Sequence, residues 1–315
     1  GGTQTNMTVI TAALKPWQGA ICADTGHIAC HETGAVEATG HKVLALSSED
    51  GKITAAQIEE TVKKHYEDGS REHIVQPGMV YISFPTESGT LYSKQELTDI
   101  YAVCKAHDMP LFIDGARLGY GLQSPACDVT LPELANLCDV FYIGGTKCGA
   151  LFGEAVVILK ESLKKDFRYM IKQRGGMFAK GRLLGIQFDT LFTDGLYEAI
   201  CGEAVKKAMT LREAFLAKGI SMYGSSMTNQ QFPILTDAQK ELMAPSLVRK
   251  LTDSEAKIAE LTKSEDDKKQ ETPTTEAKPT TKPSNPQVNT VAVKKGTTFI
   301  VKGYKYRVTS NLVKN

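Results

Sequence analysis

The fold is decided by two stretches, PLFIDGAR at residues 110–117 and DVFYIGGTK at residues 139–147. Each begins as a short apolar strand, and a charged side chain follows at or just beyond its end, Asp114 in the first and Lys147 in the second. In open α/β sheets, ligands bind beyond the carboxyl ends of the strands. The two stretches therefore predict a site to which both side chains contribute.

Outward from these stretches, β-branched and apolar runs alternate with amphipathic ones. Two amphipathic runs begin with the spacing of a capping box, Thr54 with Gln57 and Ser93 with Glu96. The alternation predicts an α/β fold in which helices cover both faces of a mainly parallel sheet. The predicted strands are 43–46, 79–84, 110–113, 139–143 and 155–159, and the predicted helices are 4–14, 54–66, 93–107, 161–172 and a long one near 180–216.

The composition is typical of a globular protein: of 315 residues, 42% are hydrophobic and 23% are charged, and the net charge is +1. This balance gives no reason to expect nucleic acid or an anionic membrane as a partner. No apolar stretch approaches the roughly 20 residues that span a bilayer. The seven cysteines have no paired spacing, which indicates reduced thiols in a cytoplasmic chain and no metal site.

The character of the chain changes after Asp237. Residues 238–287 combine an amphipathic helix with a linker rich in Lys, Thr and Pro, whose composition predicts disorder. Residues 288–315 alternate apolar and polar side chains around two Lys-Gly turns, with six basic and no acidic residues. We therefore expect a large domain over 1–237, this helix and linker, and a small β-hairpin tail.

Four features of the large domain carry chemistry, and each also has an ordinary structural explanation. Asp114 fits either a turn cap or a carboxylate that pairs with a cationic ring nitrogen. Lys147 fits either a solvated surface charge or an amine that loses its proton and forms a Schiff base. Gly1-Gly2-Thr3 precedes a helix, where backbone N–H groups bind phosphate. His27 fits either a structural histidine or a ring that stacks on an aromatic cofactor. Together they are what pyridoxal phosphate requires.

Five segments resemble, in order, spacing and sequence, the large domain of the threonine aldolase and β-eliminating lyase family. They are GGTQTN, ADTGHIACHETGAVEATG, IDGARLGYG, YIGGTKCGALFGEA and IKQRGGMFAKGRLLGIQF, and they lie within the first 237 residues. The resemblance implies the aspartate-aminotransferase type of fold (fold type I), with a mainly parallel sheet of the seven-stranded type. Because the chain opens at Gly1 directly in one of these segments, we expect a preceding segment of the family to be missing.

The resemblance also implies the role of each candidate residue. Lys147 looks like the Schiff-base lysine, and Asp114 like the partner of the cofactor's ring nitrogen. Gly2 and Thr3 would contact the phosphate of pyridoxal phosphate, and His27 would stack on its ring. Arg117 would hold the substrate carboxylate by a forked ion pair.

The activity implied is retro-aldol cleavage of β-hydroxy amino acids such as threonine to glycine and an aldehyde, by a homotetramer with sites between subunits. Either His27 or a bound water is the base for the β-hydroxyl proton. Many members carry Asn-Thr-His after the central strand, where this chain has Pro85-Thr86-Glu87, so that histidine's role has no counterpart here. The basic segment Lys172-Gln173-Arg174 is a candidate for reaching a neighbouring site.

Three alternatives stay open on the sequence alone. Within the enzymes, β-elimination and racemisation share the same cofactor chemistry. The second arginine that the family's small domain supplies has no candidate in 238–315, and losing one charged contact to a carboxylate costs about 1.5–3 kcal/mol of binding. We therefore expect a weak or inactive aldolase. A non-catalytic cell-surface module, or fusion, whose basic tail binds a polyanion is the alternative from another class.

Overall fold

The computed structural model describes residues 1–243, 298–301 and 304–307. Contacts divide the chain into two units, Gly1–Ile234 and Leu235–Asn315. None of the helices in the described residues is long and apolar enough to cross a membrane. The boundaries predicted at 237 and 287 stay predictions.

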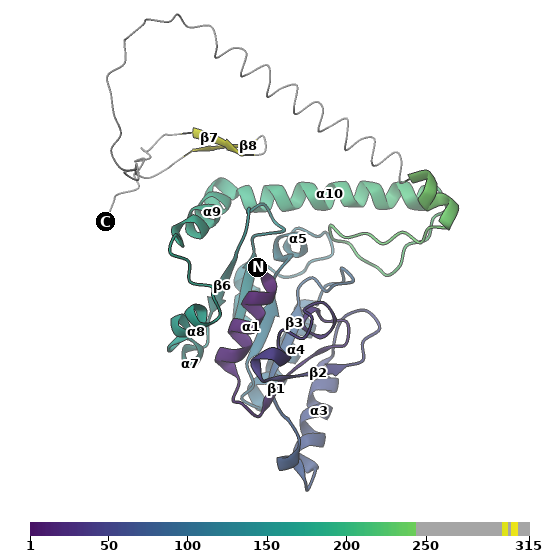
Figure 1. The fold of residues 1–315 in the computed structure, drawn as a ribbon. Coiled ribbons are helices and arrows are strands. Elements are labelled where there is room, and N and C mark those ends of the chain that lie inside the picture. The colour runs from purple at the N-terminus through teal and green to yellow at the C-terminus, as the bar shows by residue number, and fades with distance from the viewer. Residues whose placement is uncertain (244–297, 302–303, 308–315) are drawn as a thin grey trace, which may run out of the picture. The chain divides into compact units, whose positions relative to one another are not determined.

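The first unit is built on a six-stranded sheet with the order β2-β1-β3-β4-β5-β6 (Figure 1). Every neighbouring pair from β2 to β5 is parallel, and β6 runs antiparallel to β5. The predicted α/β fold with a mainly parallel sheet is confirmed, with six strands in the described residues where the seven-stranded type was expected. The strands are β1 (Gln18–Ala23), β2 (Lys42–Leu46), β3 (Gln76–Ser83), β4 (Leu111–Asp114), β5 (Val140–Gly144) and β6 (Glu154–Ile158).

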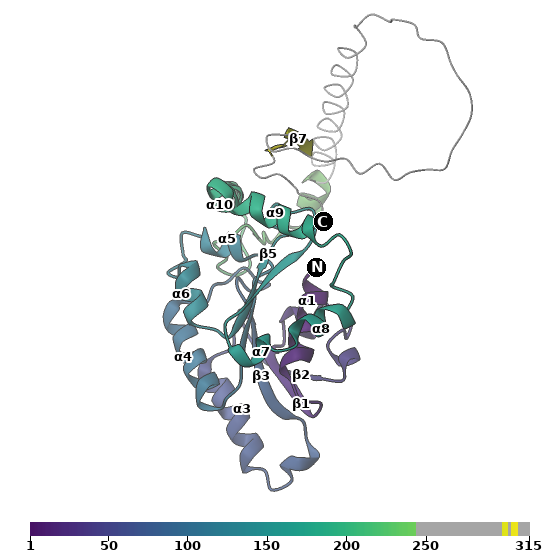
Figure 2. The ribbon, with the colours of Figure 1, turned by 90° about the vertical axis from the view of Figure 1, so that its left-hand side faces the viewer.

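Helices cover both faces of this sheet, as Figure 2 shows with α3, α4 and α6 on one side and α1, α7 and α8 on the other. The α-helices of the unit are α1 (Gly2–Ala13), α2 (His27–Cys30), α3 (Ala55–Glu67), α4 (Lys94–Ala106), α5 (Leu118–Leu122), α6 (Leu131–Asn136), α7 (Glu161–Lys164), α8 (Phe167–Gln173), α9 (Arg182–Phe192) and α10 (Leu196–Ala217). The predicted capping boxes at Thr54 and Ser93 are both formed.

Two hydrophobic cores follow from the period of two along the strands. In β3, Val80 and Ile82 face the core with α3 and α4, whereas Met79 and Tyr81 face the core with α1. All four side chains are at most 3% exposed. The central strands are therefore buried on both faces, which is why they appear in the sequence as continuous apolar runs.

One strand of the sheet was not predicted, and two predicted helices are each divided in two. The strand β1 was not predicted, because its GAICA run is short and made largely of small residues. The helix expected over 161–172 breaks into α7 and α8 at Asp166, whose φ is +60°. The long helix expected over 180–216 breaks into α9 and α10 at Asp194 and Gly195, which also have positive φ. Left-handed backbone ends a right-handed helix.

The second unit contains one described β-hairpin, in which β7 (Thr298–Val301) pairs antiparallel with β8 (Tyr304–Arg307). Both strands lie where the apolar and polar residues of the tail alternate. The amphipathic helix and the linker predicted before them fall almost entirely on 244–297, outside the described residues.

Candidate active site

A cavity of about 230 Å³ lies at the carboxyl ends of β3, β4 and β5. Ser83 and Asp114 are the last residues of β3 and β4 and stand side by side in the sheet register. The structure brings all the sequence-predicted site residues together in the lining of this cavity: Gly2, Thr3, His27, Asp114, Arg117 and Lys147. The amine and the carboxylate therefore face one space, as the two strand-end stretches predict.

Asp114 is held by four hydrogen bonds and is only 4% exposed. Its Oδ2 accepts from Tyr81 Oη at 2.5 Å and from Asn6 Nδ2 at 3.1 Å. Its Oδ1 accepts from Tyr142 Oη at 2.5 Å and from the Ala116 amide at 2.9 Å. All four donors are neutral. A buried carboxylate without a cationic partner among its donors is suited to a ligand that brings a positive charge.

The tip of β4 approaches β5 so closely that the residue after Asp114 must be glycine. A Cβ on Gly115 would lie 1.9 Å from the Tyr142 carbonyl oxygen. The Gly144 amide donates to the Gly115 carbonyl at 2.9 Å, which fixes the crossing. This contact brings the segment that carries Lys147 beside Asp114.

Lys147 follows β5 and lines the cavity. Partial burial and the nearby Arg117 guanidinium lower the pKa of its amine. Its backbone carbonyl accepts from Tyr120 Oη at 2.5 Å, which anchors the loop on α5. A lysine with a lowered pKa is more often neutral and is a better nucleophile at neutral pH than a surface lysine.

The first turn of α1 faces the same cavity. Its N-cap is Gly1, and no side chain caps the helix, so that the first backbone N–H groups are left for a ligand. A Cβ on Gly2 would lie 3.1 Å from Tyr142 Oη, a tight contact with a hydroxyl group that is hydrogen-bonded to Asp114. An uncapped start of a helix of 12 residues is suited to a phosphate group.

His27 belongs to a hydrogen-bonded chain that ends at Asp114. Its Nδ1 lies 2.8 Å from Glu32 Oε1, and Asn6 Nδ2 donates to both Glu32 Oε1 at 2.8 Å and Asp114 Oδ2. The hydrogen bond to Glu32 raises the pKa of His27 above its usual value. Because Nδ1 is taken by Glu32, Nε2 is the ring nitrogen left for other partners.

Two more carboxyl groups line the cavity. Ser83 Oγ and the His27 amide donate to Glu87 Oε1 at 2.7 and 3.0 Å, while the buried Glu87 Oε2 has no partner in the described residues. The Gly145 amide and Thr146 Oγ1 donate to the two oxygens of Glu154 at 2.8 and 2.9 Å. Burial raises the pKa of both glutamates.

The two arginines that the sequence suggested as candidate site residues, Arg117 and Arg174, have different surroundings. Arg117 lines the cavity, and its guanidinium has no hydrogen bond or ion pair with the described residues, so it is available to a substrate carboxylate. Arg174 instead donates to Thr11 Oγ1 on α1 at 3.3 Å, and its carbonyl accepts from Gln4. Within this chain, Arg174 therefore fastens the end of α8 to α1.

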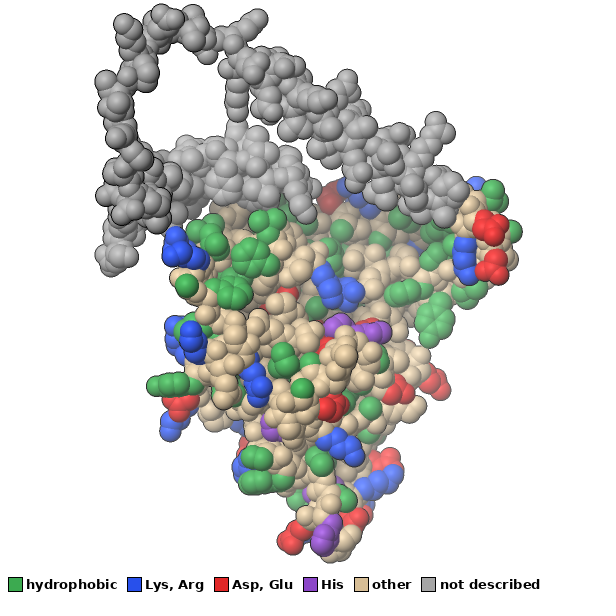
Figure 3. All heavy atoms as spheres, viewed as in Figure 1, with side chains coloured by type: hydrophobic (Ala, Val, Ile, Leu, Met, Phe, Trp, Pro, Cys, Tyr) green, Lys and Arg blue, Asp and Glu red, His purple; other side chains and the backbone are tan. Residues whose placement is uncertain are grey.

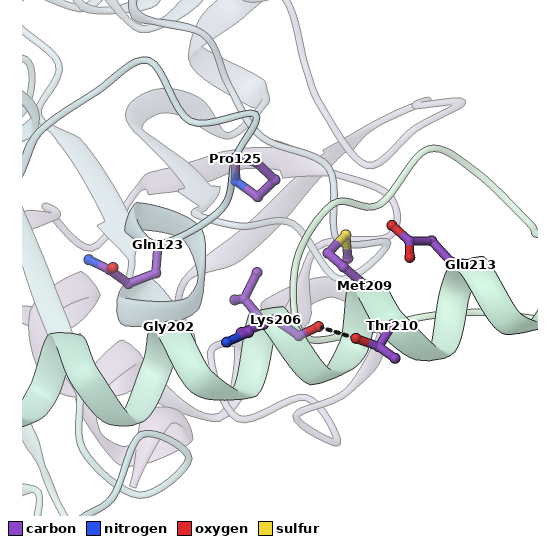
Figure 4. Close-up of a pocket in the computed structure, with 8 residues that line it drawn as sticks. Gln123, Pro125, Gly202, Lys206, Met209, Thr210 and Glu213 are labelled. Carbon is purple, nitrogen blue, oxygen red and sulfur yellow. Dashed lines mark hydrogen bonds between the residues drawn. The ribbon is translucent and has the colours of Figure 1, made fainter.

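A second groove of about 370 Å³ lies between α10 and the segment after α5. Its polar side chains Gln123, Lys206 and Glu213 lie apart from one another, and no hydrogen bond joins them (Figure 4). None of the predicted site residues lines it. Its polar groups do not converge on one point, as those of a ligand site do.

Comparisons with known proteins show the family to which the chain belongs. The family model for β-eliminating lyases matches residues 1–296. The chain belongs to the β-eliminating lyase family. Pyridoxal phosphate is the cofactor on which this family depends. The recognition made from the five sequence segments is thereby confirmed.

Two relatives within this family are threonine aldolases. The structure of a threonine aldolase from Leishmania major is 48% identical, with a TM-score of 0.75 over 78% of this chain and 70% of that one. A low-specificity L-threonine aldolase from a Pseudomonas strain is 33% identical over 62% of this chain and 56% of its own length. The chain thus spans less than two thirds of that curated relative.

A more distant structure shows the fold alone. Aspartate aminotransferase from Thermus thermophilus has a TM-score of 0.53 at 14% identity, over 72% of this chain and 58% of that one. The expected aspartate-aminotransferase type of fold is therefore confirmed.

The strand-end cavity of this chain fits pyridoxal phosphate in three ways. Lys147 supplies an amine with a lowered pKa, Asp114 supplies a buried carboxylate that lacks a cation, and α1 supplies an uncapped helix start. All three line one cavity, which is the arrangement that an aldehyde, a ring nitrogen and a phosphate on one molecule require.

Sequence reasoning missed the side chains that support these groups. Tyr81 and Tyr142 were assigned to apolar strands, although their hydroxyl groups hold Asp114. Glu32 lies in the same quoted segment as His27, five residues on, and Asn6 closes the segment that opens the chain. The available signal was a buried aromatic residue with a polar tip, which needs a partner when buried.

Proposed function

We propose that this chain is a pyridoxal-phosphate-dependent lyase that cleaves β-hydroxy amino acids such as threonine to glycine and an aldehyde. The observation that carries the proposal is that Lys147 and Asp114 line one cavity together with an uncapped helix start. Likeness to threonine aldolases at 33% and 48% identity supports the substrate class. When bound, the cofactor supplies an electron sink for the bond that breaks at Cα.

The residues of this chain would hold the reactants in place. Lys147 would hold the cofactor through its amine, Asp114 would accept a hydrogen bond from the ring nitrogen, and the amides of Gly2 and Thr3 would bind the phosphate. His27 would stack on the ring, with Nδ1 fixed by Glu32. Arg117 would bind the substrate carboxylate, because its guanidinium has no partner in the described residues.

A reduction experiment tests cofactor binding. The purified chain is mixed with pyridoxal phosphate and reduced with borohydride, and the modified peptide is mapped. We expect the label on Lys147, and glycine release from threonine in the unreduced protein. Label spread over surface lysines, with unchanged absorbance, would contradict the proposal. The second arginine has no assigned residue, so we expect weak binding of threonine, measured as a high KM.

β-Elimination is the second candidate reaction. The observation that favours it is that the matching family model is that of the β-eliminating lyases. Aldol cleavage gives an aldehyde and glycine, whereas elimination from serine or β-chloroalanine gives pyruvate and ammonia. Racemisation gives neither. Product analysis with threonine and with β-chloroalanine separates the three reactions. The non-catalytic surface module finds no support in the comparisons.

We propose further that the chain acts as a homo-oligomer, a tetramer as the family resemblance implies. Around the start of α9, large apolar side chains are exposed: Leu151 by 57%, Phe152 by 39%, Phe178 by 49% and Leu183 by 49%. Figure 3 shows hydrophobic side chains gathered in this region. Contiguous exposed apolar side chains mark interaction surfaces. Light scattering should give the mass of four chains, and Leu183→Glu should lower it, whereas Leu211→Glu on α10 should not.

We propose a cytoplasmic location. Its support is that all seven cysteines are free and five of them are buried, as is usual in a reducing compartment. Cell fractionation with an antibody against the chain tests it.

A further inference from the structure

The carboxyl groups of the cavity differ in how much hydrogen-bonding capacity the protein has left them. Asp114 accepts on both oxygens from four donors. Glu154 also accepts on both oxygens, from Gly145 and Thr146. Glu87 alone among these three has an oxygen, Oε2, without a partner in the described residues. Glu87 is therefore the carboxylate of the cavity that has room for a proton.

The other oxygen of Glu87 fixes the orientation of the side chain. Its Oε1 accepts from Ser83 Oγ at 2.7 Å and from the His27 amide at 3.0 Å. Ser83 is the last residue of β3, and His27 begins α2. Two anchors on separate elements hold the carboxyl group at the cavity between the predicted stacking histidine and the tip of the central strand, which is the preorganisation that an acid–base residue requires.

Burial makes Glu87 a better base than an ordinary glutamate would be. Desolvation raises its pKa, and the charge of Asp114 adds to the rise, whereas the Ser83 hydrogen bond and the charge of His27 oppose it. A general base works best when its pKa lies close to the working pH. The two carboxylates therefore have separate tasks, since Asp114 is saturated by donors and Glu87 is not.

His27 is the weaker candidate for the same task. Its Nδ1 is bound to Glu32 Oε1, and this hydrogen bond raises the pKa of the imidazole. A histidine with a raised pKa holds its proton over more of the physiological range and is less often free to accept another. The surroundings suit it for stacking and for donating a hydrogen bond.

We infer that Glu87, at the place where many family members carry a histidine, is the catalytic base of C–C cleavage in this chain. The inference rests on the proposed function. The β-hydroxyl proton passes to Glu87 Oε2, the O–H electron pair forms the aldehyde C=O bond, and the Cα–Cβ bond breaks. The Cα–Cβ electron pair stays with Cα, which later takes a proton to give glycine.

The first test compares two reactions of the loaded enzyme. Glu87→Gln keeps the shape and the acceptor Oε1 but cannot take a proton. We expect it to lower kcat for threonine cleavage by about 10²–10³-fold. Exchange of the glycine α-proton with solvent deuterium, which involves no hydroxyl group, should stay within about twofold of the parent. The exposed Glu72→Gln is the matched control, and Glu87→Asp, which keeps a base but shortens it, should fall between.

A second test needs no cofactor. The carbonyl stretch of a protonated, buried carboxyl group is visible in the infrared spectrum. We expect a band that titrates above the ordinary range of glutamate in the parent and in Glu72→Gln and that is absent from Glu87→Gln. The band of Glu154, whose pKa burial also raises, should be present in all three proteins. Thermal melting of the three proteins shows that each is folded.

The outcomes separate the inference from the proposed function. A parent that neither labels at Lys147 nor exchanges glycine protons overturns the proposed function. A parent that cleaves threonine while Glu87→Gln cleaves it equally fast overturns the inference alone. Equal loss of cleavage and exchange in Glu87→Gln also overturns it, because Glu87 would then act on cofactor binding. If Glu87→Gln does not fold, parental kcat in Glu87→Asp or a missing infrared band overturns it.

Discussion

The first unit has a groove beside α10 and a cavity at the strand ends, and the two differ in volume and in how their polar side chains are arranged. The groove beside α10 is the larger, at about 370 Å³, and the cavity at the ends of β3, β4 and β5 is the smaller, at about 230 Å³. The charged side chains of the groove, Lys206 and Glu213, are exposed on one helix. In the cavity, the groups come from different strand ends and helices, and several of them are hydrogen-bonded to one another. Convergence, and not volume, distinguishes a site.

The largest effect that this contrast predicts is that of Lys147→Ala. Removing the amine that would hold the cofactor should lower threonine cleavage on the order of 10⁴-fold or more, because it removes the covalent attachment on which the reaction depends. Lys206→Ala, in the larger groove, is the control and should leave kcat/KM unchanged. Steady-state glycine release measures both. Comparable loss in the two variants would break the contrast between the hollows.

Asp114→Asn should have the next largest effect. The amide keeps the shape, but it removes the negative charge and places an NH₂ group toward the hydroxyl of Tyr81 or Tyr142. Loss of one preorganised electrostatic contact lowers kcat by about 10²–10³-fold. We expect borohydride to label Lys147 in this variant still. A variant with parental kcat would show that the carboxylate has no electrostatic part in the reaction.

The sequence predicted the two groups of largest effect because both follow apolar strands and both lie in segments that resemble one family. Such a strand end is visible in the local sequence as an apolar run followed by glycine and a charged residue. It can be recognised without knowing which distant residues contact it. The fold was predictable for the same reason, since strands buried on both faces are continuous apolar runs. β1 was not predicted because GAICA has only one large β-branched residue, Ile21, among small ones.

The supporting groups were not predictable, since each depends on a contact across a long sequence separation. Asn6 bridges Glu32 and Asp114, which is 108 residues away. In the sequence, Glu87 is only a departure from the family pattern. Its orientation at the cavity depends on hydrogen bonds from Ser83 and the His27 amide, which the sequence does not show. A single sequence gives the identity of such residues but not their geometry.

Glu32→Gln is expected to have a smaller effect, because Glu32 supports the cavity without lining it. The substitution removes the negative charge beside His27. The pKa of His27 should fall toward its ordinary value, since the hydrogen bond to Glu32 is the largest cause of its rise. An NMR titration of the His27 ring protons measures this change. An unchanged pKa would show that another group holds the histidine proton.

The same pair predicts a pH dependence of stability. The pKa of His27 is raised in the folded state above 6.5. The pair therefore adds stability that is fully present below the unfolded pKa and is lost as the pH rises through the folded pKa. The melting temperature of the parent should exceed that of Glu32→Gln more at about pH 5.5 than at about pH 8.5. A difference that grows with pH would contradict this sign.

The smallest expected effect comes from Thr210→Ala in the α10 groove. Thr210 Oγ1 donates to the Lys206 carbonyl one turn earlier at 3.2 Å, a bond that competes with the helix. Alanine has the higher helix propensity, so unfolding free energy should rise by about 0.3–0.7 kcal/mol, measured by urea denaturation. Threonine cleavage should not change. If this substitution lowered kcat/KM severalfold, the larger groove would be coupled to the reaction, and convergence of side chains would no longer suffice to tell the two hollows apart.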